Sequence, residues 1–181
     1  MKLLRVTARW LAPVVLVAAF ADHAAVAATA AADAGAAGGG TASAASPIYG
    51  VTIPHGYREW QMVAPAAEAA PLDELRVVLG NPVAIAAIRN ATQPFPDGTI
   101  LVKLAYKKKQ SDEFAPATVP GEATTVQVMV KDSRRYASTG GWGFGRFING
   151  MPADLAQHQT CFACHAARVK ERDYVFTRYA P

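Results

Sequence analysis

The chain has 181 residues, of which 51% are hydrophobic, and its formal net charge is +4 at pH 7. The N-terminus inflates the hydrophobic fraction, so this fraction does not indicate an integral membrane protein. Without residues 1–27, which hold three basic residues and one acidic residue, the charge falls from +4 to +2. A charge this small excludes a nucleic-acid-binding surface, and the basic run at residues 107–109 is typical of a solvated loop.

The first 27 residues have the order of a secretory signal peptide. Basic residues at positions 2, 5 and 9 precede a short apolar run over residues 10–21, and small residues at 25–27 form a cleavage site. The apolar run is too short for a transmembrane helix and is interrupted by Pro13. We expect cleavage after Ala27 and export to the periplasm, with an uncleaved membrane anchor as the alternative.

Residues 28–46 are almost entirely Ala, Gly, Thr and Ser, so they lack the large side chains that a core requires. We expect this segment to form a flexible tether. The folded domain should then comprise residues 47–181, and about 135 residues suffice for one domain with a hydrophobic core.

Turn signals and hydrophobic periodicity divide this domain into short strands and helices. Asn81 at the N-cap and Pro82 at the first helical position mark the start of a helix. The expected elements, in chain order, are a turn or short helix over residues 54–59, strands over 60–63 and 75–79, a helix over 82–89, a turn over 94–98, a strand over 99–107, a loop over 111–122, strands over 124–130 and 142–148, and a helix over 154–167.

Two of these strands show the alternation of a sheet whose faces differ. In residues 99–107 the even-numbered side chains share one face, and Lys103 lies on the other. In residues 124–130 three valines share one face, and Gln127 and Met129 lie on the other. If the two strands are neighbours in the sheet, Lys103 and Gln127 can line the same pocket.

The last expected helix carries Cys161, Cys164 and His165 in a C-x-x-C-H motif, which is the signal for covalent attachment of haem c. Each thiol can add to one haem vinyl group, and His165 would then be the axial ligand of the iron. One haem c is therefore the expected cofactor.

Three other uses of these cysteines, the only two in the chain, are a dithiol redox pair, a disulfide and half of a zinc site. A redox pair usually follows a strand in a βαβ unit, and no such unit is visible. A disulfide leaves the adjacent His165 unexplained. His55 and His158 do not supply a recognisable pair of further zinc ligands. The motif therefore favours haem c.

Several strands precede this single helix, whereas an ordinary small cytochrome c is all helical. The order predicts an α+β fold. We expect a mainly antiparallel β-sheet with a few short helices, one of which carries the haem c motif near the C-terminus.

Four blocks of the domain carry a family resemblance. They are YREW at 57–60, PDGTILVK at 96–103, VKDS at 130–133 followed by GGWGF at 140–144, and CFACH at 161–165 followed by DYVFTR at 173–178. In this order they resemble the cytochrome P-460 family. The resemblance implies a mainly antiparallel β fold, often dimeric, with one haem c whose iron has the motif histidine below and an open distal position. Founding members oxidise hydroxylamine, and a related branch, the β-type cytochromes c′, binds nitric oxide and other small gases.

The resemblance also implies roles for two residues of the sheet. It places at Lys103 a lysine that the family's enzymes cross-link to a haem meso carbon, and at Gln127 a distal carboxylate that moves protons. A glutamine amide cannot act as a general base near neutral pH, so hydroxylamine oxidation is expected to be weak or absent. The alternatives are a Lys103 amine that reaches water at the sheet margin and a Gln127 amide that is simply half-buried.

A methionine as sixth iron ligand would instead make an electron-transfer cytochrome. The resemblance favours core packing for Met129, Met62 and Met151. His55 and His158 are expected at the surface or in structural roles. Further candidates for the haem edge, the sheet core or a propionate contact are Trp142, Phe144, Arg76 and Arg178.

Together these observations predict an exported mono-haem c-type cytochrome with an open distal iron site. Its expected ligand is a small nitrogenous molecule or a diatomic gas, and hydroxylamine oxidation is a further activity that the resemblance allows. The alternative is a six-coordinate periplasmic electron-transfer cytochrome c. The expected partners are the small ligand, a redox partner protein and, by the family resemblance, a second copy of the chain.

Overall fold

The computed structural model describes residues 44–180. The predicted signal peptide and most of the predicted tether therefore lie outside the described residues. Ser46, the last residue of the predicted tether, is buried. Its hydroxyl donates to the carbonyl of Phe144 at 3.0 Å and accepts from the amide of Val51 at 3.1 Å. Contacts with the sheet thus begin one residue before the predicted domain boundary.

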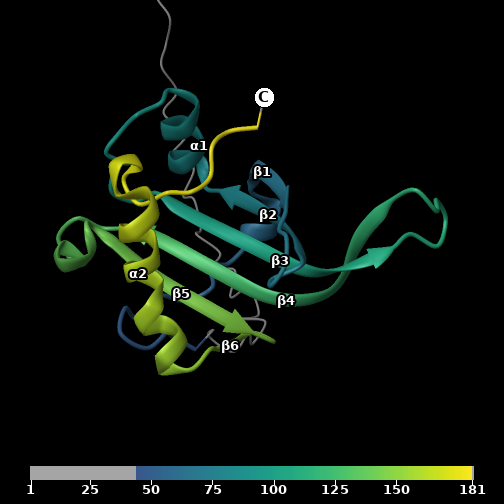
Figure 1. Ribbon diagram of the computed structural model, residues 1–181. Coiled ribbons are helices and arrows are strands. Elements are labelled where there is room, and N and C mark those ends of the chain that lie inside the picture. Colours follow the sequence, from purple (N-terminus) through teal and green to yellow (C-terminus); the bar gives the residue numbers. More distant parts are fainter. Residues whose placement is uncertain (1–43, 181) are drawn as a thin grey trace, which may run out of the picture. The chain divides into compact units, whose positions relative to one another are not determined.

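Within residues 44–180, six antiparallel strands form one sheet, and their order in the sheet follows the chain (Figure 1). The strands are β1 (Gln61–Ala67), β2 (Glu74–Gly80), β3 (Ile100–Gln110), β4 (Thr118–Lys131), β5 (Trp142–Ile148) and β6 (Met151–Pro152). The helices are α1 (Pro82–Arg89) and α2 (Leu155–Val169), and short 3-10 turns cover Tyr57–Glu59, Ala137–Thr139 and Lys170–Arg172. This mainly antiparallel α+β architecture confirms the predicted fold class.

Capping side chains start both helices. Asn81 caps α1, because its Oδ1 accepts a hydrogen bond of 2.9 Å from the Ala84 amide, and Pro82 takes the first helical position as predicted. Asp154 caps α2 in the same way, with a bond of 2.8 Å from the Gln157 amide. No helix of the described residues is long and apolar enough to span a membrane.

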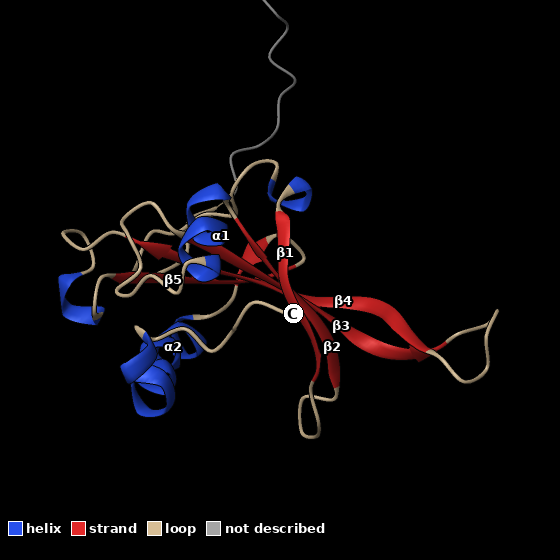
Figure 2. Ribbon diagram, turned by 90° about the horizontal axis from the view of Figure 1, so that it is seen from above, coloured by secondary structure: helices blue, strands red, loops and turns tan. Residues whose placement is uncertain are grey.

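The side chains of β3 and β4 alternate between the two faces of the sheet, as the sequence predicted, and each face packs into its own hydrophobic cluster. Even-numbered residues such as Val102 and Val128 pack with the segment that precedes β1. Odd-numbered residues such as Leu101 and Met129 pack with residues of both helices. Figure 2 shows α2 on one side of the sheet, and this side is the odd-numbered face.

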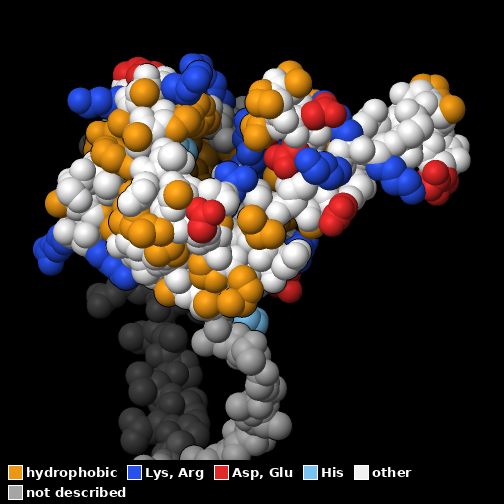
Figure 3. All heavy atoms as spheres, turned by 60° about the horizontal axis from the view of Figure 1, so that its bottom comes forward, with side chains coloured by type: hydrophobic (Ala, Val, Ile, Leu, Met, Phe, Trp, Pro, Cys, Tyr) orange, Lys and Arg blue, Asp and Glu red, His pale blue; other side chains and the backbone are white. Residues whose placement is uncertain are grey.

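β3 and β4 continue beyond the sheet as a two-stranded arm, which is visible on the right of Figure 1. Lys108 pairs with Pro120 and Gln110 with Thr118, so the predicted loop over residues 111–122 is wrong in its second half. The basic run at residues 107–109 likewise lies in β3 rather than in a loop. Both strands of an arm are edges, where proline and charged side chains are tolerated. Figure 3 shows basic and acidic side chains beside one another along the arm.

Candidate functional site

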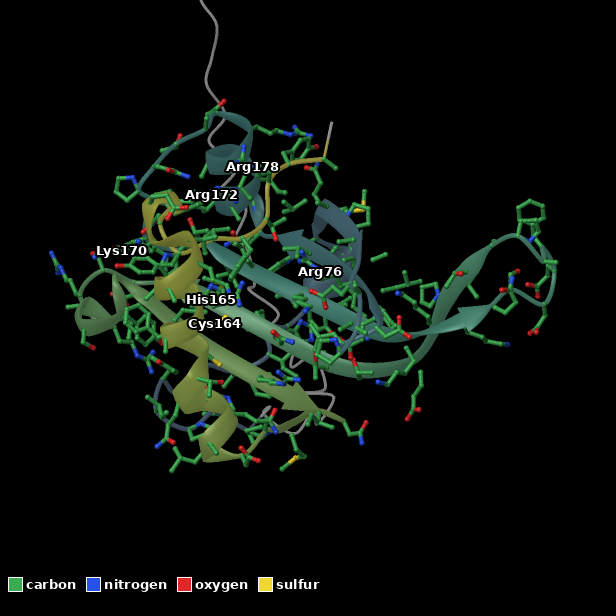
Figure 4. All side chains as sticks on the ribbon, in the orientation of Figure 1. Arg76, Cys164, His165, Lys170, Arg172 and Arg178 are labelled. Atoms are coloured by element: carbon green, nitrogen blue, oxygen red, sulfur yellow. The ribbon has the colours of Figure 1, made fainter. Side chains whose placement is uncertain are left out.

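Cys161, Cys164 and His165 lie on one face of α2, because residues three and four positions apart are neighbours on a helix. Figure 4 shows Cys164 and His165 together near the middle of this helix. Both cysteines are free thiols, Cys161 half-buried and Cys164 exposed. Burial raises the pKa of the Cys161 thiol, so this thiol is protonated at neutral pH.

A backbone carbonyl orients the imidazole of His165. The Nδ1 atom lies 2.7 Å from the carbonyl oxygen of Tyr174, so Nδ1 carries the ring proton and donates it. Burial lowers the pKa of His165, and the hydrogen bond to Tyr174 raises it by a smaller amount. The net lowering of the pKa favours the neutral ring. The Nε2 atom then keeps a free electron pair, and neutral imidazole in this form is a metal ligand.

A cavity of about 430 Å³ lies between α2 and the odd-numbered face of the sheet. All three residues of the motif line it, and Leu101, Met129 and Phe144 form part of the opposite wall. The ring of Phe144 also packs against His165 with 5.0 Å between the ring centres. The volume falls within the range of pockets that enclose small molecules and cofactors.

Three charged side chains form a cluster in the lining of this cavity. The carboxylate of Glu68 lies 3.0 Å from Nε of Arg76 and 3.1 Å from Nζ of Lys103. Each of these side chains is about one-fifth exposed, with values of 19% to 21%. Lys103 and Glu68 therefore face each other as an ion pair in the lining of the cavity. Figure 4 labels Arg76 on the sheet and His165 and Cys164 on α2, and all three residues line the cavity.

Lys103, Gln127 and Arg146 stand in one row across β3, β4 and β5. The register pairs Gln127 with Lys103 on one side and with Arg146 on the other, and all three line the cavity. The two strands identified from the sequence are thus neighbours. The Gln127 amide donates to the hydroxyl of Thr125 at 3.0 Å. The amide of Gln127 thus stands between the cationic side chains of Lys103 and Arg146. The carboxylate of Glu68, which pairs with Lys103, lines the same cavity.

Of the three methionines predicted to pack in the core, one does so and two are exposed. Met129 packs against the core as expected. Met62 and Met151 are 48% and 62% exposed, so the prediction of core packing is wrong for both. Met62 lies on β1 and Met151 on β6, which are the edge strands of the sheet. Side chains at an edge find packing partners on fewer sides, so apolar residues can stay exposed there.

The remaining candidates divide between the cavity and the scaffold. Arg76 and Phe144 line the cavity, whereas Trp142 is fully buried in the core and Arg178 is exposed outside the lining. His158 is a buried structural residue whose Nε2 accepts the Arg146 amide at 3.1 Å.

If the two cysteines formed half of a zinc site, two more ligands would have to lie beside them. His55 is exposed, and within residues 44–180 no three His, Cys, Asp or Glu side chains are placed to hold a metal ion.

Sequence reasoning missed Glu68, Arg146 and Arg168, which all line the cavity. Arg168 follows Cys164 by four positions on α2, so helical spacing alone could have identified it. Arg146 is identifiable only from the strand register. Glu68 follows β1, whereas the strand predicted there ended at Val63, so no sequence signal placed its carboxylate.

A helix that presents two thiols and a neutral imidazole to a cavity beside an antiparallel sheet is the architecture of a haem-binding α+β protein. The Cytochrome P460 family model matches residues 54–177, which is most of the chain. The chain belongs to the Cytochrome P460 family and is a haem cytochrome. No curated protein matches the chain.

The residues of the cavity fit a haem. Apolar side chains such as Leu101, Met129 and Phe144 form part of its sheet side. Its basic side chains, Arg76, Lys103, Arg146 and Arg168, outnumber the single carboxylate of Glu68. Haem propionates are carboxylates, and charge-assisted hydrogen bonds to arginine and lysine suit them. Thiols, imidazole, apolar walls and excess positive charge are thus all present in one cavity.

Proposed function

We propose that the protein is an exported cytochrome with one haem c, whose iron keeps an open position for a small nitrogenous ligand or a diatomic gas. The observation that carries this proposal is the cavity between α2 and the sheet. One wall bears Cys161, Cys164 and His165, and the sheet opposite bears both apolar side chains and the polar row of Lys103, Gln127 and Arg146.

Cys161 and Cys164 would hold the haem covalently. Each S–H adds across one vinyl group, so that a carbon–sulfur bond forms and the thiol hydrogen goes to the neighbouring carbon without any oxidant or reductant. His165, whose Nδ1 proton is donated to Tyr174, would bind the iron through Nε2. When bound, the haem supplies an iron centre that accepts a ligand or an electron.

The residues opposite α2 favour ligand binding over rapid hydroxylamine oxidation. Gln127 has an amide that cannot take a proton near neutral pH. Lys103 forms an ion pair with Glu68, so a carboxylate already engages its amine in the cavity. Leu101 and Met129, which line the cavity, would present apolar surface to a small ligand.

A second candidate function is electron transfer by a six-coordinate haem c. The observation that favours it is the thioether of Met129, which lines the cavity and is of a type that can bind haem iron. Met129 is also paired with Leu101 and Phe144 in the sheet and packs against the core. Core packing therefore accounts for Met129 without a bond to iron.

The ferrous absorption spectrum separates the two functions. The protein is produced with haem-attachment machinery and reduced, and carbon monoxide is then added. An open iron position predicts a high-spin spectrum that changes when carbon monoxide binds. A sharp low-spin spectrum that ignores carbon monoxide would establish the electron carrier and overturn the first proposal. His165→Ala should destroy normal ligation in either case.

Covalent attachment has its own test. Haem should stay with the denatured protein on a gel and resist extraction by acidic acetone. The double variant Cys161→Ala/Cys164→Ala should lose it, because no thiol remains to form a thioether. Extraction of haem from the wild type would contradict covalent attachment.

Export and partners belong to the same proposal. Haem-stained protein should appear in the periplasmic fraction, with residue 28 at its N-terminus after cleavage. A haem-stained band confined to the membrane fraction would instead support an uncleaved anchor. We further propose a redox partner protein and a homodimer, and light scattering of the purified protein tests the homodimer.

A further inference from the structure

A largely buried ion pair joins the end of β4 to the segment that follows α2. Lys131, the last residue of β4, places Nζ 2.8 Å from both carboxylate oxygens of Asp173. The two side chains are 5% and 10% exposed. Lys131 also donates to the carbonyl of Gly140 at 3.0 Å and lies 5.1 Å from the centre of the Trp142 ring. Neither Lys131 nor Asp173 lines the cavity.

The burial of this pair calls for a role beyond stability. Taking two charges out of water costs about as much as their attraction returns, so apolar residues of similar volume often stabilise a fold equally well. Lys131 lies in the block VKDS and Asp173 in the block DYVFTR, and the proposed function uses neither side chain. A role in positioning other groups is therefore indicated.

Asp173 anchors a turn with an unusual backbone. Asp173 has φ 48° and Tyr174 has φ 64°, and residues other than glycine rarely adopt this left-handed region. Such residues persist where their surroundings hold them. Here the carboxylate of Asp173 accepts the Phe95 amide at 2.7 Å in addition to its pair with Lys131. The Tyr174 amide donates to the carbonyl of Val169 at 2.9 Å.

The turn directs the carbonyl of Tyr174 at His165, 2.7 Å from Nδ1. The ring of Tyr174 lies over Gly140, where an added Cβ would collide with it. A continuous series of contacts thus runs from Lys131 through Asp173 and the Tyr174 carbonyl to the imidazole of His165.

We propose that Lys131 and Asp173 are positioning residues for the axial ligand, because they hold the turn whose Tyr174 carbonyl accepts the Nδ1 proton of His165. This inference rests on the proposed function, in which His165 binds the iron. A partner that accepts the Nδ1 proton fixes the ring and makes the imidazole a stronger ligand. Loss of the ion pair should therefore weaken the bond between iron and His165 without changing any residue of the cavity.

Resonance Raman spectroscopy of the ferrous, haem-loaded protein tests the proposal. Lys131→Met removes the ammonium, and Asp173→Asn keeps an oxygen that can accept the Phe95 amide. Both variants should shift the iron–histidine stretching band to lower frequency and raise the midpoint potential, with haem still attached to the cysteines. Lys109→Met is the matched control, because it removes an ion pair with the 72% exposed side chain of Asp112. The control should leave the band unchanged.

The outcomes separate the proposal from its alternatives. An unchanged band in folded Lys131→Met and Asp173→Asn overturns it. The double variant should shift the band no further than either single variant, because both residues act through one pair, and additive shifts also overturn it. If the single variants fail to fold, the double variant decides, since it leaves no unpaired buried charge. His165→Ala should abolish the iron–histidine band that the wild type shows. If the band persisted in this variant, the proposed function, in which His165 binds the iron, would be overturned instead.

Discussion

If Lys103 is bonded to the haem, replacing Gln127 by glutamate should give the protein a hydroxylamine oxidation rate well above that of the wild type. The substitution keeps the length of the side chain and exchanges an amide, which cannot accept a proton, for a carboxylate, which can. Residue 127 lines the same cavity as His165 and stands between Lys103 and Arg146 in the sheet. The new carboxylate would thus enter the cavity from the wall opposite α2.

The neighbours of residue 127 set the size of the expected gain. A positioned proton acceptor typically contributes about a hundredfold to ten-thousandfold in rate. Residues directly opposite in antiparallel strands have Cβ atoms about 5 Å apart, so Lys103 and Arg146 both lie close to the new carboxylate. Two cations hold the pKa of such a carboxyl below its usual range and weaken it as a base. We therefore expect about a hundredfold gain, which is about 2.7 kcal/mol of activation free energy.

Steady-state oxidation of hydroxylamine by haem-loaded protein, followed with an artificial electron acceptor, measures this gain. Gln159→Glu is the matched control, because it makes the same chemical change at an exposed position of α2 outside the cavity. Peptide mass spectrometry of both variants shows whether Lys103 carries haem, since the gain is expected where this bond is present. Wild-type turnover as fast as that of Gln127→Glu would refute the reasoning, because no carboxylate would then be needed at this position.

Three further predictions concern the iron ligands and stability. Met129→Leu should leave the ferrous spectrum nearly unchanged, because a packing methionine tolerates a side chain of similar volume; loss of low-spin character would identify a sixth ligand. Lys131→Met should lower the free energy of unfolding by about 3–5 kcal/mol, because it leaves a buried carboxylate unpaired. The control Lys109→Met, which breaks an exposed ion pair, should cost less than about 1 kcal/mol in the same chemical denaturation. Hydrogen bonds from the hydroxyl and amide of Ser133 lower the pKa of Asp97 in the folded protein. Its contribution to stability is therefore complete above the pKa of the unfolded chain, about 3.9, and is lost as pH falls through the lower pKa of the folded protein. Asp97→Asn should therefore flatten the loss of stability in acid, and urea titrations below about pH 5 that match the wild type would contradict this.

Signals with a local physical cause predicted most of the sheet and both helices. Asn81 and Pro82 start α1 because a cap and a fixed φ act within one turn of the chain. The alternation of β3 brought Lys103 to the face that α2 covers, since side-chain direction in a strand depends on position alone. The three residues of the C-x-x-C-H motif share one face because they lie three and four positions apart on α2.

Features that depend on pairing between distant segments were not predictable in this way. The arm of β3 and β4 is held by its own ladder, although its sequence is polar and contains Pro120. Glu68 lies in a stretch of alanines that gives no hint of a site. Its place at the cavity shows only in its ion pairs with Arg76 and Lys103, which come from β2 and β3. The exposure of Met62 follows from the place of β1 at the sheet edge, which no property of residues 60–63 reveals.

The acceptor that orients His165 is a backbone carbonyl, and every amino acid has one. No exchange of the side chain at position 174 can delete this group, and only a change in the path of the chain can move it. A saturation library at position 174, scored by retained haem ligation, should therefore rank residues by how readily they enter the left-handed region. Glycine and asparagine should be tolerated better than valine and isoleucine, although neither resembles Tyr174 in size or shape. Position 174 would then accept side chains according to the backbone conformation that they allow, while the carbonyl that orients His165 stays the same.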